Sequence, residues 1–198
     1  MTQIAVLGNG RVGGNLAKGL SRAGHEVTAT GRAPGAAAAA VREARIVVNA
    51  TPGEGSLDRL TALREELSGK ILVDVSNATV DGPDGLPADL IYPGTSLAEQ
   101  LQEALPDTRV VKTLNTMLFP VMTAPDTLAQ APTAFLSGED PEAKRTVREL
   151  LADLGWREEW ITDLGGIRTA RATEAAILFV PHVIRSSGFA PFAISVVR

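Results

Sequence analysis

Residues 4–27 read IAVLGNGRVGGNLAKGLSRAGHEV, and this stretch decides the fold. It opens with the apolar run Ile4–Leu7, whose continuous hydrophobicity is typical of a strand buried on both faces. Apolar or small residues then recur at helical spacing between Arg11 and Ala23, and Gly24 supplies a helix C-terminus. The stretch therefore predicts a strand that is followed directly by an amphipathic helix.

The turn between this strand and this helix is a Gly-x-Gly-x-x-Gly motif at residues 8–13. Its first glycine permits a tight turn, its second lets a pyrophosphate approach the backbone, and its third lets the helix pack against the strand. The free N–H groups and the positive dipole end of the helix then attract phosphates. The motif predicts dinucleotide binding, and the alternative is a plain turn with three glycines. The residues that we expect to bind the cofactor here are Gly8, Asn9, Gly10, Arg11, Val12 and Gly13.

The end of the second predicted strand indicates which dinucleotide binds. NAD sites usually place Asp or Glu there to bind the ribose 2′-hydroxyl, but this strand ends in Thr30, Gly31 and Arg32. A guanidinium attracts a 2′-phosphate that a carboxylate would repel, and the Thr30 hydroxyl can add a hydrogen bond. We therefore expect these three residues to bind NADP (NADPH); the alternative is that Arg32 is a solvated loop residue.

Two further strand ends lie where a dinucleotide would run. Ligands of open parallel sheets bind beyond the carboxyl ends of the strands, near the point where the strand order reverses. Ala50, Thr51 and Pro52 follow the third strand, and their small size leaves room for the ribose and the diphosphate. Asn77 follows the fourth strand, and its amide can bind the nicotinamide ribose. The alternative for each of these residues is a plain loop role.

Strand and helix patterns alternate along the chain. This alternation indicates an α/β fold of the Rossmann type, with a doubly wound, mostly parallel sheet and a C-terminal helical cover. We expect one NAD(P)-binding domain over residues 1–198, in which residues from about 166 to 198 form the helical cover.

Three local features lead to further expectations. Residues 76–95 hold so many Pro and Gly residues that we expect no regular element there. A helix is expected over 56–67, with Ser56 as its N-cap. A helix over 169–187 is expected to bend or break near Pro181.

Composition excludes several classes of function. The chain has 198 residues and a formal charge of −4, which argues against a nucleic-acid or anionic-membrane partner. It has no cysteine, so disulfide scaffolds and cysteine nucleophiles are excluded, and His25 and His182 do not suggest a metal centre. The N-terminus lacks a signal-peptide pattern, and no apolar run is long enough to span a membrane. We expect a cytoplasmic protein that binds neither nucleic acid nor membrane.

Several segments occur in the order and spacing of a known family: IVVNATP, ILVDVSNA, VVKTLNTM, FLSGEDPEAKRTVRELLADLGW and DLGGIRTARATEA. With them the chain resembles the NADPH-dependent reductases of the deazaflavin coenzyme F420 (F-420), a group similar to the N-terminal domain of pyrroline-5-carboxylate reductase. The resemblance implies direct hydride transfer between the nicotinamide and the deazaflavin. It also implies that Asn115, Thr116 and Met117 line the substrate pocket, and that the helix over 170–188 forms its far wall and a homodimer contact. The family's second-strand turn usually reads Gly-Ser-Arg, whereas position 31 here is glycine.

The favoured function is an NADP-dependent oxidoreductase that passes hydride to or from a small acceptor, with F420 as the co-substrate that the resemblance implies. The Tyr-x-x-x-Lys acid of short-chain dehydrogenases is absent, because the single tyrosine, Tyr92, is followed four residues later by Ser96. Hydride transfer from ring to ring requires positioning and water exclusion rather than a general acid, so we assign no catalytic residue and no metal ligand. Two alternatives stay open: an imine or ketone reductase, and an NADP(H)-binding redox sensor without turnover.

Overall fold

A parallel sheet forms the centre of the molecule in the computed structural model, which describes residues 1–197. Its five strands lie in the order β2 (Glu26–Thr30), β1 (Gln3–Leu7), β3 (Ile46–Asn49), β4 (Ile71–Asp74) and β7 (Arg109–Lys112). The chain leaves β1 toward β2 on one side and then returns to β3 on the other, so the strand order reverses between β1 and β3. The expected doubly wound α/β fold is confirmed.

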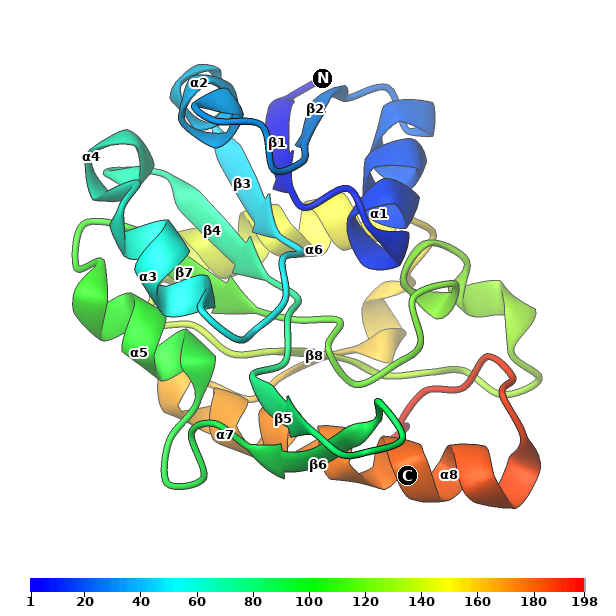
Figure 1. The fold of residues 1–198 in the computed structure, drawn as a ribbon. Coiled ribbons are helices and arrows are strands. Elements are labelled where there is room, and N and C mark those ends of the chain that lie inside the picture. Colours follow the sequence, from blue (N-terminus) through cyan, green and yellow to red (C-terminus); the bar gives the residue numbers. More distant parts are fainter. Residues whose placement is uncertain (198) are drawn as a thin grey trace.

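Helices cover both faces of this sheet (Figure 1). One face packs against α1 (Arg11–Arg22) and α6 (Pro141–Asp153). The other face packs against four helices, α2 (Ala36–Glu43), α3 (Ser56–Thr61), α4 (Arg64–Leu67) and α5 (Leu97–Ala104). The strands β3 and β4 are buried at every position, which explains why they read as continuous apolar runs rather than as an alternating pattern.

The described residues also form two small, two-stranded sheets. A parallel pair, β8 (Ala134–Leu136) and β9 (Ile161–Asp163), is joined to β7 by the antiparallel bridge between Lys112 and Ser137. The second is an antiparallel hairpin of β5 (Thr79–Asp81) and β6 (Pro87–Leu90). The expectation of no regular element over 76–95 was therefore wrong, because its prolines and glycines lie at the turn and at the strand ends.

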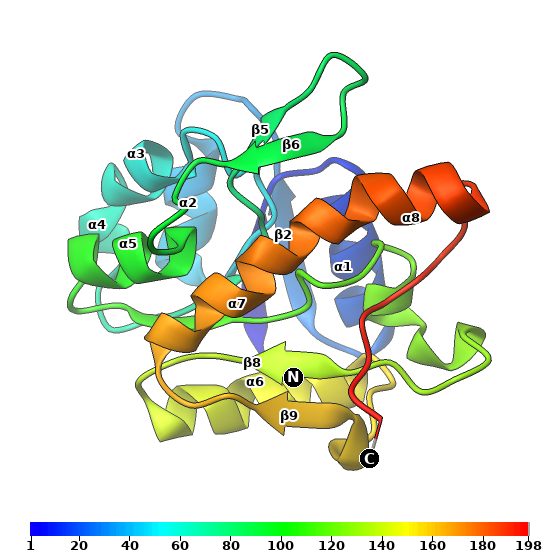
Figure 2. The same cartoon turned by 90° about the horizontal axis from the view of Figure 1, so that it is seen from below.

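The C-terminal cover is helical, as expected, and crosses below the carboxyl ends of the strands (Figure 2). It consists of the 3-10 turn η4 (Ile167–Thr169), α7 (Ala170–Ala175), the 3-10 turn η5 (Ala176–Leu178) and α8 (Phe179–Ser187). The interruption lies at η5, before Pro181 rather than at it. Pro181 stands in the first turn of α8, where a missing N–H is tolerated. Three more 3-10 turns are η1 (Val121–Thr123), η2 (Pro125–Thr127) and η3 (Glu158–Trp160).

The helix expected over 56–67 is divided into α3 and α4, and its N-cap is Gly55 rather than Ser56. The Ser56 side chain is buried and accepts a hydrogen bond from Asn49 Nδ2 at 2.9 Å. The hydroxyl that we expected at the helix end is therefore part of a network inside the protein.

A buried ion cluster joins the sheet to the C-terminal cover. The Nζ atom of Lys112 on β7 lies 2.7 Å from Asp74 Oδ2 on β4 and 2.8 Å from Glu174 Oε1 on α7. All three side chains are at most 5% exposed. Glu174 also accepts the backbone N–H groups of Leu97 and Ala98 at the start of α5. The positive end of that helix offsets the second carboxylate, so the cluster holds α5 and α7 against the sheet.

We predict that Lys112→Met lowers the free energy of unfolding by about 3–5 kcal/mol, because two buried carboxylates lose their counter-ion. Urea denaturation followed by circular dichroism measures this loss. The exposed Lys18 on α1 gives a matched control, and Lys18→Met should change the free energy of unfolding by less than about 0.5 kcal/mol. Equal effects of the two substitutions would show that the cluster does not stabilise the fold.

The cluster also predicts a pH dependence. Burial lowers the pKa of Lys112, but the Asp74 and Glu174 carboxylates raise it more, and the net pKa lies above the ordinary lysine value. Because the folded-state pKa is raised, the stabilisation is complete below the unfolded-state pKa of about 10.4 and is lost only as the pH rises through the folded-state value. The stability difference between wild type and Lys112→Met should therefore be constant from neutral pH to about pH 10.

Candidate functional site

A cavity of about 810 Å³ lies at the carboxyl ends of the central strands. The arrowheads of these strands point toward the side of the molecule that holds the β5–β6 hairpin and α8 (Figure 1). The cavity includes the ends of β1 and β3, where the strand order reverses. Of the residues predicted from the sequence to bind cofactor or substrate, those that line it are Gly8, Asn9, Gly10, Arg11, Val12, Thr30, Gly31, Arg32, Ala50, Thr51, Pro52, Asn77, Asn115 and Met117.

Two of the predicted residues are not part of the lining. Gly13 lies beneath the turn, and a Cβ atom there would stand 1.9 Å from the Gly8 carbonyl oxygen, so its role is close packing of α1 against β1. Thr116 is buried, and its hydroxyl has no hydrogen-bond partner among the described residues. Its neighbours Asn115 and Met117 do face the cavity.

The glycine turn has the shape that a bound phosphate requires. Gly8 has a φ of +102°, and a Cβ atom on it would lie 2.5 Å from the Ala50 carbonyl oxygen. At Gly10, by contrast, a Cβ atom would meet nothing within 4 Å, so protein packing does not require a glycine there. Gly10 is the N-cap of α1 and provides no side chain to the N–H groups of the first turn. The open space before Gly10 and these free donors fit a pyrophosphate.

Cationic side chains surround the cavity. Arg11, Arg32 and Arg59 line it, and no Asp, Glu, His, Lys or Tyr of residues 1–197 does. The Arg11 guanidinium lies 5.9 Å from the centre of the Phe119 ring. A chain with a net charge of −4 thus places three positive charges around this one cavity, which favours an anionic ligand.

Arg59 was not predicted from the sequence. It belongs to α3 and donates to the carbonyl oxygens of Pro52 and Glu54, the latter at 2.8 Å, so it holds the loop after β3 in place. Its position in the first turn of the helix that follows the Thr51-Pro52 strand end is the signal that could have identified it.

Gly31 lies against the glycine turn. A Cβ atom on Gly31 would stand 3.0 Å from the side-chain nitrogen of Asn9, so the amide of Asn9 lies close to the end of β2. A side chain at position 31, where the family that the sequence resembles usually has serine, would therefore meet this amide.

Two asparagines join the ends of β4 and β7. Asn77 Nδ2 donates to the Asn115 carbonyl oxygen at 3.0 Å, and Asn115 Nδ2 donates to Asn77 Oδ1 at 2.9 Å. Each amide therefore keeps only part of its hydrogen-bonding capacity for a ligand. The pair fixes the distance between the predicted ribose subsite and the predicted substrate pocket.

Beyond this pair the cavity wall is apolar. The wall residues that sequence reasoning did not assign individually are Leu118, Phe119, Met122, Ile177 and Phe189. Ile177 lies in η5 and Phe189 follows α8, so the C-terminal cover does supply a wall of the cavity. The chain after α8 returns to this region, where Leu118 N donates to the Phe192 carbonyl oxygen and Ile194 N donates to that of Thr116, both at 3.0 Å.

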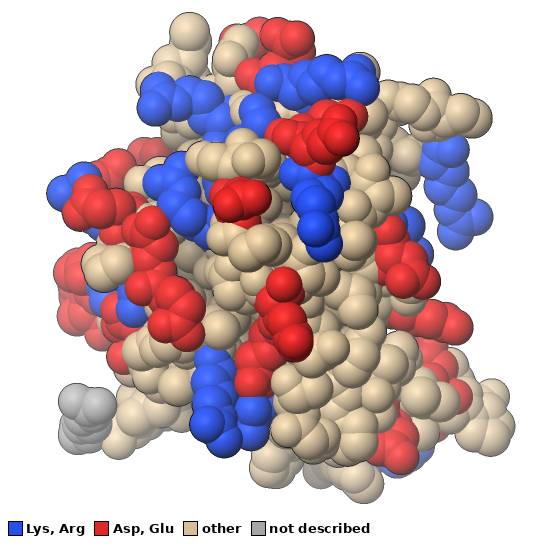
Figure 3. Space-filling view, turned by 90° about the vertical axis from the view of Figure 1, so that its left-hand side faces the viewer, with Lys and Arg blue, Asp and Glu red and all other residues tan. Residues whose placement is uncertain are grey.

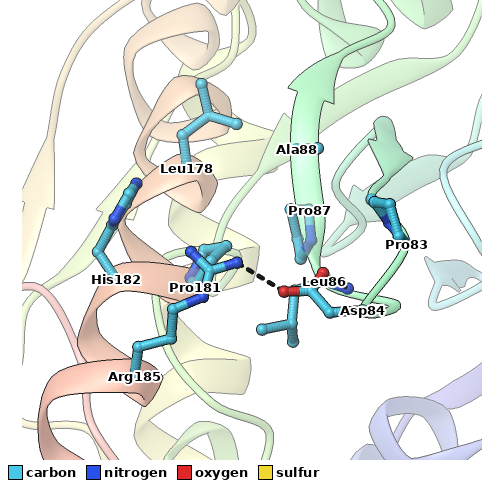
Figure 4. Close-up of a pocket in the computed structure, with 10 residues that line it drawn as sticks. Pro83, Asp84, Leu86, Pro87, Ala88, Leu178, Pro181, His182 and Arg185 are labelled. Atoms are coloured by element: carbon cyan, nitrogen blue, oxygen red, sulfur yellow. Dashed lines mark hydrogen bonds and ion pairs between the residues drawn. The ribbon is translucent and has the colours of Figure 1, made fainter.

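A second cavity, of about 550 Å³, lies between the β5–β6 hairpin and α8 (Figure 4). Arg185 extends from α8 toward the hairpin and pairs with Asp84 at 2.6 Å. His182 lines this cavity and not the first one, and His25 pairs with Asp153 at 3.0 Å. Neither histidine of the chain therefore faces the candidate site.

Acidic and basic side chains are interspersed over the outer surface around α2 to α5, so this face has no large patch of one charge (Figure 3). Within residues 1–197, none of the helices combines the length and the apolar character that crossing a membrane requires.

A family model, a curated relative and a solved structure name the same family. Residues 3–52 match the family model described as "NADP oxidoreductase coenzyme F420-dependent". The F420-dependent NADP reductase of Methanocaldococcus jannaschii is 29% identical over 138 residues, which are 69% of this chain and 60% of that protein. The chain thus spans less than two thirds of that relative.

Two solved structures extend the likeness to most or all of the chain. A protein of an Arthrobacter species assigned as an F420-dependent NADP reductase is 38% identical, with full coverage of both chains and a TM-score of 0.91. A hypothetical protein of Sinorhizobium meliloti is 30% identical, covers 85% of this chain and 88% of its own, and gives a TM-score of 0.66. The similarity therefore includes the C-terminal cover as well as the glycine turn.

The glycine geometry predicts that substitution by alanine has different effects at Gly13 and at Gly10. Gly13→Ala should lower the free energy of unfolding by about 1–3 kcal/mol or more, because the new methyl group overlaps the Gly8 carbonyl. Gly10→Ala should leave stability nearly unchanged, since its φ of −72° suits alanine, but should weaken NADPH binding about ten- to a hundredfold by obstructing a charged hydrogen bond.

Thermal unfolding and fluorescence titration with NADPH measure the two effects. If Gly10→Ala binds NADPH as tightly as wild type, the phosphates do not lie before Gly10.

Proposed function

The chain belongs to the family of coenzyme F420-dependent NADP oxidoreductases, and on this premise we propose that it transfers hydride between NADP(H) and the deazaflavin F420. The observation that carries the proposal is the cavity itself, which joins a glycine turn and three arginines to an apolar compartment. A dinucleotide phosphate backbone fits the first part, and a pair of stacked rings fits the second. NADPH would supply the hydride when bound, and the protein's own residues orient the two partners.

At the phosphate side, we propose that the N–H groups after Gly10 bind the pyrophosphate and that Arg32 binds the 2′-phosphate. Arg32 is exposed, lines the cavity beside Thr30, and forms no ion pair with any other described residue. Its guanidinium is thus available to a ligand. The absence of a carboxylate from the described lining supports NADP over NAD.

At the apolar side, we propose that Met117, Phe119 and Ile177 hold the nicotinamide and the deazaflavin against each other and exclude water. Exclusion of water strengthens the polar contacts at the other end of the cavity and protects the hydride donor from side reactions. No titratable side chain other than arginine lines the described cavity, which suits a reaction between two rings that needs no protein acid. Neither alternative, imine reduction or ligand sensing without turnover, has an observation that favours it.

We further propose that the protein forms a homodimer through α8. The support is an exposed apolar surface, since Phe179 on α8 is 64% exposed and Phe189 just after it is 66% exposed. Light scattering on the purified protein gives the mass that tests this.

The direct test of function is the absorbance of NADPH after mixing the purified protein with NADPH and F420 under anaerobic conditions. We expect oxidation of NADPH that depends on F420, and none with a flavin mononucleotide, a cyclic imine or a quinone. Turnover with the imine alone would establish the imine reductase alternative. Tight NADPH binding without turnover on any acceptor would establish the sensor.

We predict that Arg32→Ala weakens NADPH binding about ten- to a hundredfold, the effect of one charge-assisted hydrogen bond, and leaves NADH binding nearly unchanged. Fluorescence titration with both nucleotides measures this. Arg22→Ala, which removes an exposed arginine outside the cavity lining, is the control and should change neither. Equal losses for the two nucleotides would contradict a 2′-phosphate contact at Arg32.

A further inference from the structure

Two hydroxyl groups lie in the lining where β3 and β4 end. Thr51 follows β3, and Ser76 follows β4. Both connect to the buried Asp74 side chain, Thr51 through Asn49 and Ser76 directly. The direction of each hydrogen bond in this network can be assigned, and that direction determines what the two hydroxyls offer to a ligand.

The assignment starts at Asp74. Its carboxylate is fully buried and is paired through Oδ2 with the Lys112 ammonium at 2.7 Å, so both of its oxygens only accept hydrogen bonds. Asn49 lies 2.8 Å from Oδ1. The atom of Asn49 that faces a carboxylate must be its NH₂ group, and its carbonyl oxygen Oδ1 therefore points the other way.

That carbonyl oxygen faces Thr51. The distance between Thr51 Oγ1 and Asn49 Oδ1 is 2.7 Å, and Thr51 N lies 3.3 Å from the same oxygen. Because a carbonyl oxygen cannot donate, the single hydroxyl proton of Thr51 is committed to Asn49. The Ser56 hydroxyl and the Arg59 guanidinium can then only donate to Thr51 Oγ1, and both contacts are long, at 3.4 Å. A ligand hydroxyl can replace one of these weak contacts at a shorter distance.

Ser76 follows the same rule. Its hydroxyl lies 2.7 Å from Asp74 Oδ1 and must donate to it. The other contact of this hydroxyl within the network is a hydrogen bond of 3.3 Å from Asn49 Nδ2, which it accepts. Ser76 therefore also has no proton to offer and a lone pair to share.

We propose that Thr51 and Ser76 form a hydrogen-bond acceptor subsite that binds the hydroxyls of the nicotinamide ribose, and that Asp74 is the positioning residue that sets its polarity. This inference rests on the proposed function, because it places NADPH in the cavity. The strand order gives the location: β2 and β1 carry the predicted phosphate subsites, and β3 and β4 come next along the same edge. Because neither hydroxyl has a proton to donate, the subsite favours a ligand group that carries its own protons, such as a ribose hydroxyl.

The test compares two ligands on two matched variants. Thr51→Val keeps the shape of the side chain but removes the acceptor, and Thr51→Ser keeps the hydroxyl. We expect Thr51→Val to weaken NADPH binding about three- to tenfold, the effect of one neutral hydrogen bond, and Thr51→Ser to bind within about twofold of wild type. Adenosine 2′,5′-bisphosphate, which lacks the nicotinamide half, should bind all three proteins equally. Isothermal titration calorimetry measures each dissociation constant.

A second pair of measurements tests the polarity. Ser76→Ala should show the same ligand pattern as Thr51→Val. With an NADPH analogue whose nicotinamide ribose is 2′,3′-dideoxy, the ratio between wild type and Thr51→Val should fall to about one, because that ribose has no hydroxyl to donate. Thr146→Val on the outer surface of α6 is the control for loss of a threonine hydroxyl and should bind every ligand as wild type does.

The outcomes separate two failures. If wild type does not bind NADPH, the proposed function fails. If wild type binds NADPH but Thr51→Val binds it equally well, or loses affinity for adenosine 2′,5′-bisphosphate to the same extent, the acceptor subsite is wrong while the proposed function stands.

Discussion

The arrangement of the site depends on the ion cluster of Lys112, Asp74 and Glu174. Each of these charges is removed from water, which costs several kcal/mol per ion unless every hydrogen bond is restored. They are restored here, since Lys112 donates to both carboxylates and to the Ser76 carbonyl oxygen. Because the cluster joins β4, β7, α5 and α7, the C-terminal cover cannot shift relative to the strand ends without exposing an unpaired charge. One set of contacts therefore fixes the floor of the cavity and one of its walls.

Parallel strands place all their carboxyl ends at one edge, so the order of the strands becomes the order of chemical environments along the cavity. At β2 and β1 the protein offers donors, namely Arg32 and the N–H groups of α1. At β3 and β4 it offers acceptors, Thr51 and Ser76, above a buried carboxylate. Beyond β7 it offers mostly apolar surface. This order of donor, acceptor and apolar regions along the cavity matches a ligand that is anionic at one end and carries hydroxyls and a ring at the other.

Sequence reasoning located residues of the cavity where the signal is local. Most of the glycine turn, the arginine after β2 and the small residues after β3 line the cavity, and each could be found because it follows a short apolar strand. It failed where partners are distant in sequence: the hairpin within residues 76–95 was missed because short antiparallel strands are recognised by their pairing, not by composition. Glu174 caps α5 from 77 residues away, and no periodicity indicates such a contact. Ser56 was assigned to a helix N-cap, whereas its hydroxyl accepts a hydrogen bond from Asn49. That contact depends on how the chain folds back, so no local pattern indicates it.

The described lining has no titratable side chain other than arginine. This explains why we assign most of the site residues to positioning the ligands. A reaction that moves hydride between two rings gains mainly from holding them in contact, and a fixed geometry can supply a large part of the barrier reduction. The apolar end is accordingly built from three separate parts of the chain: the segment around Phe119, η5 with Ile177, and Phe189 after α8. Backbone hydrogen bonds from the C-terminal segment to residues 116 and 118 connect these parts. We therefore expect the residues that position the ligands to matter most for the proposed reaction, because arginine is the only titratable type in the described lining.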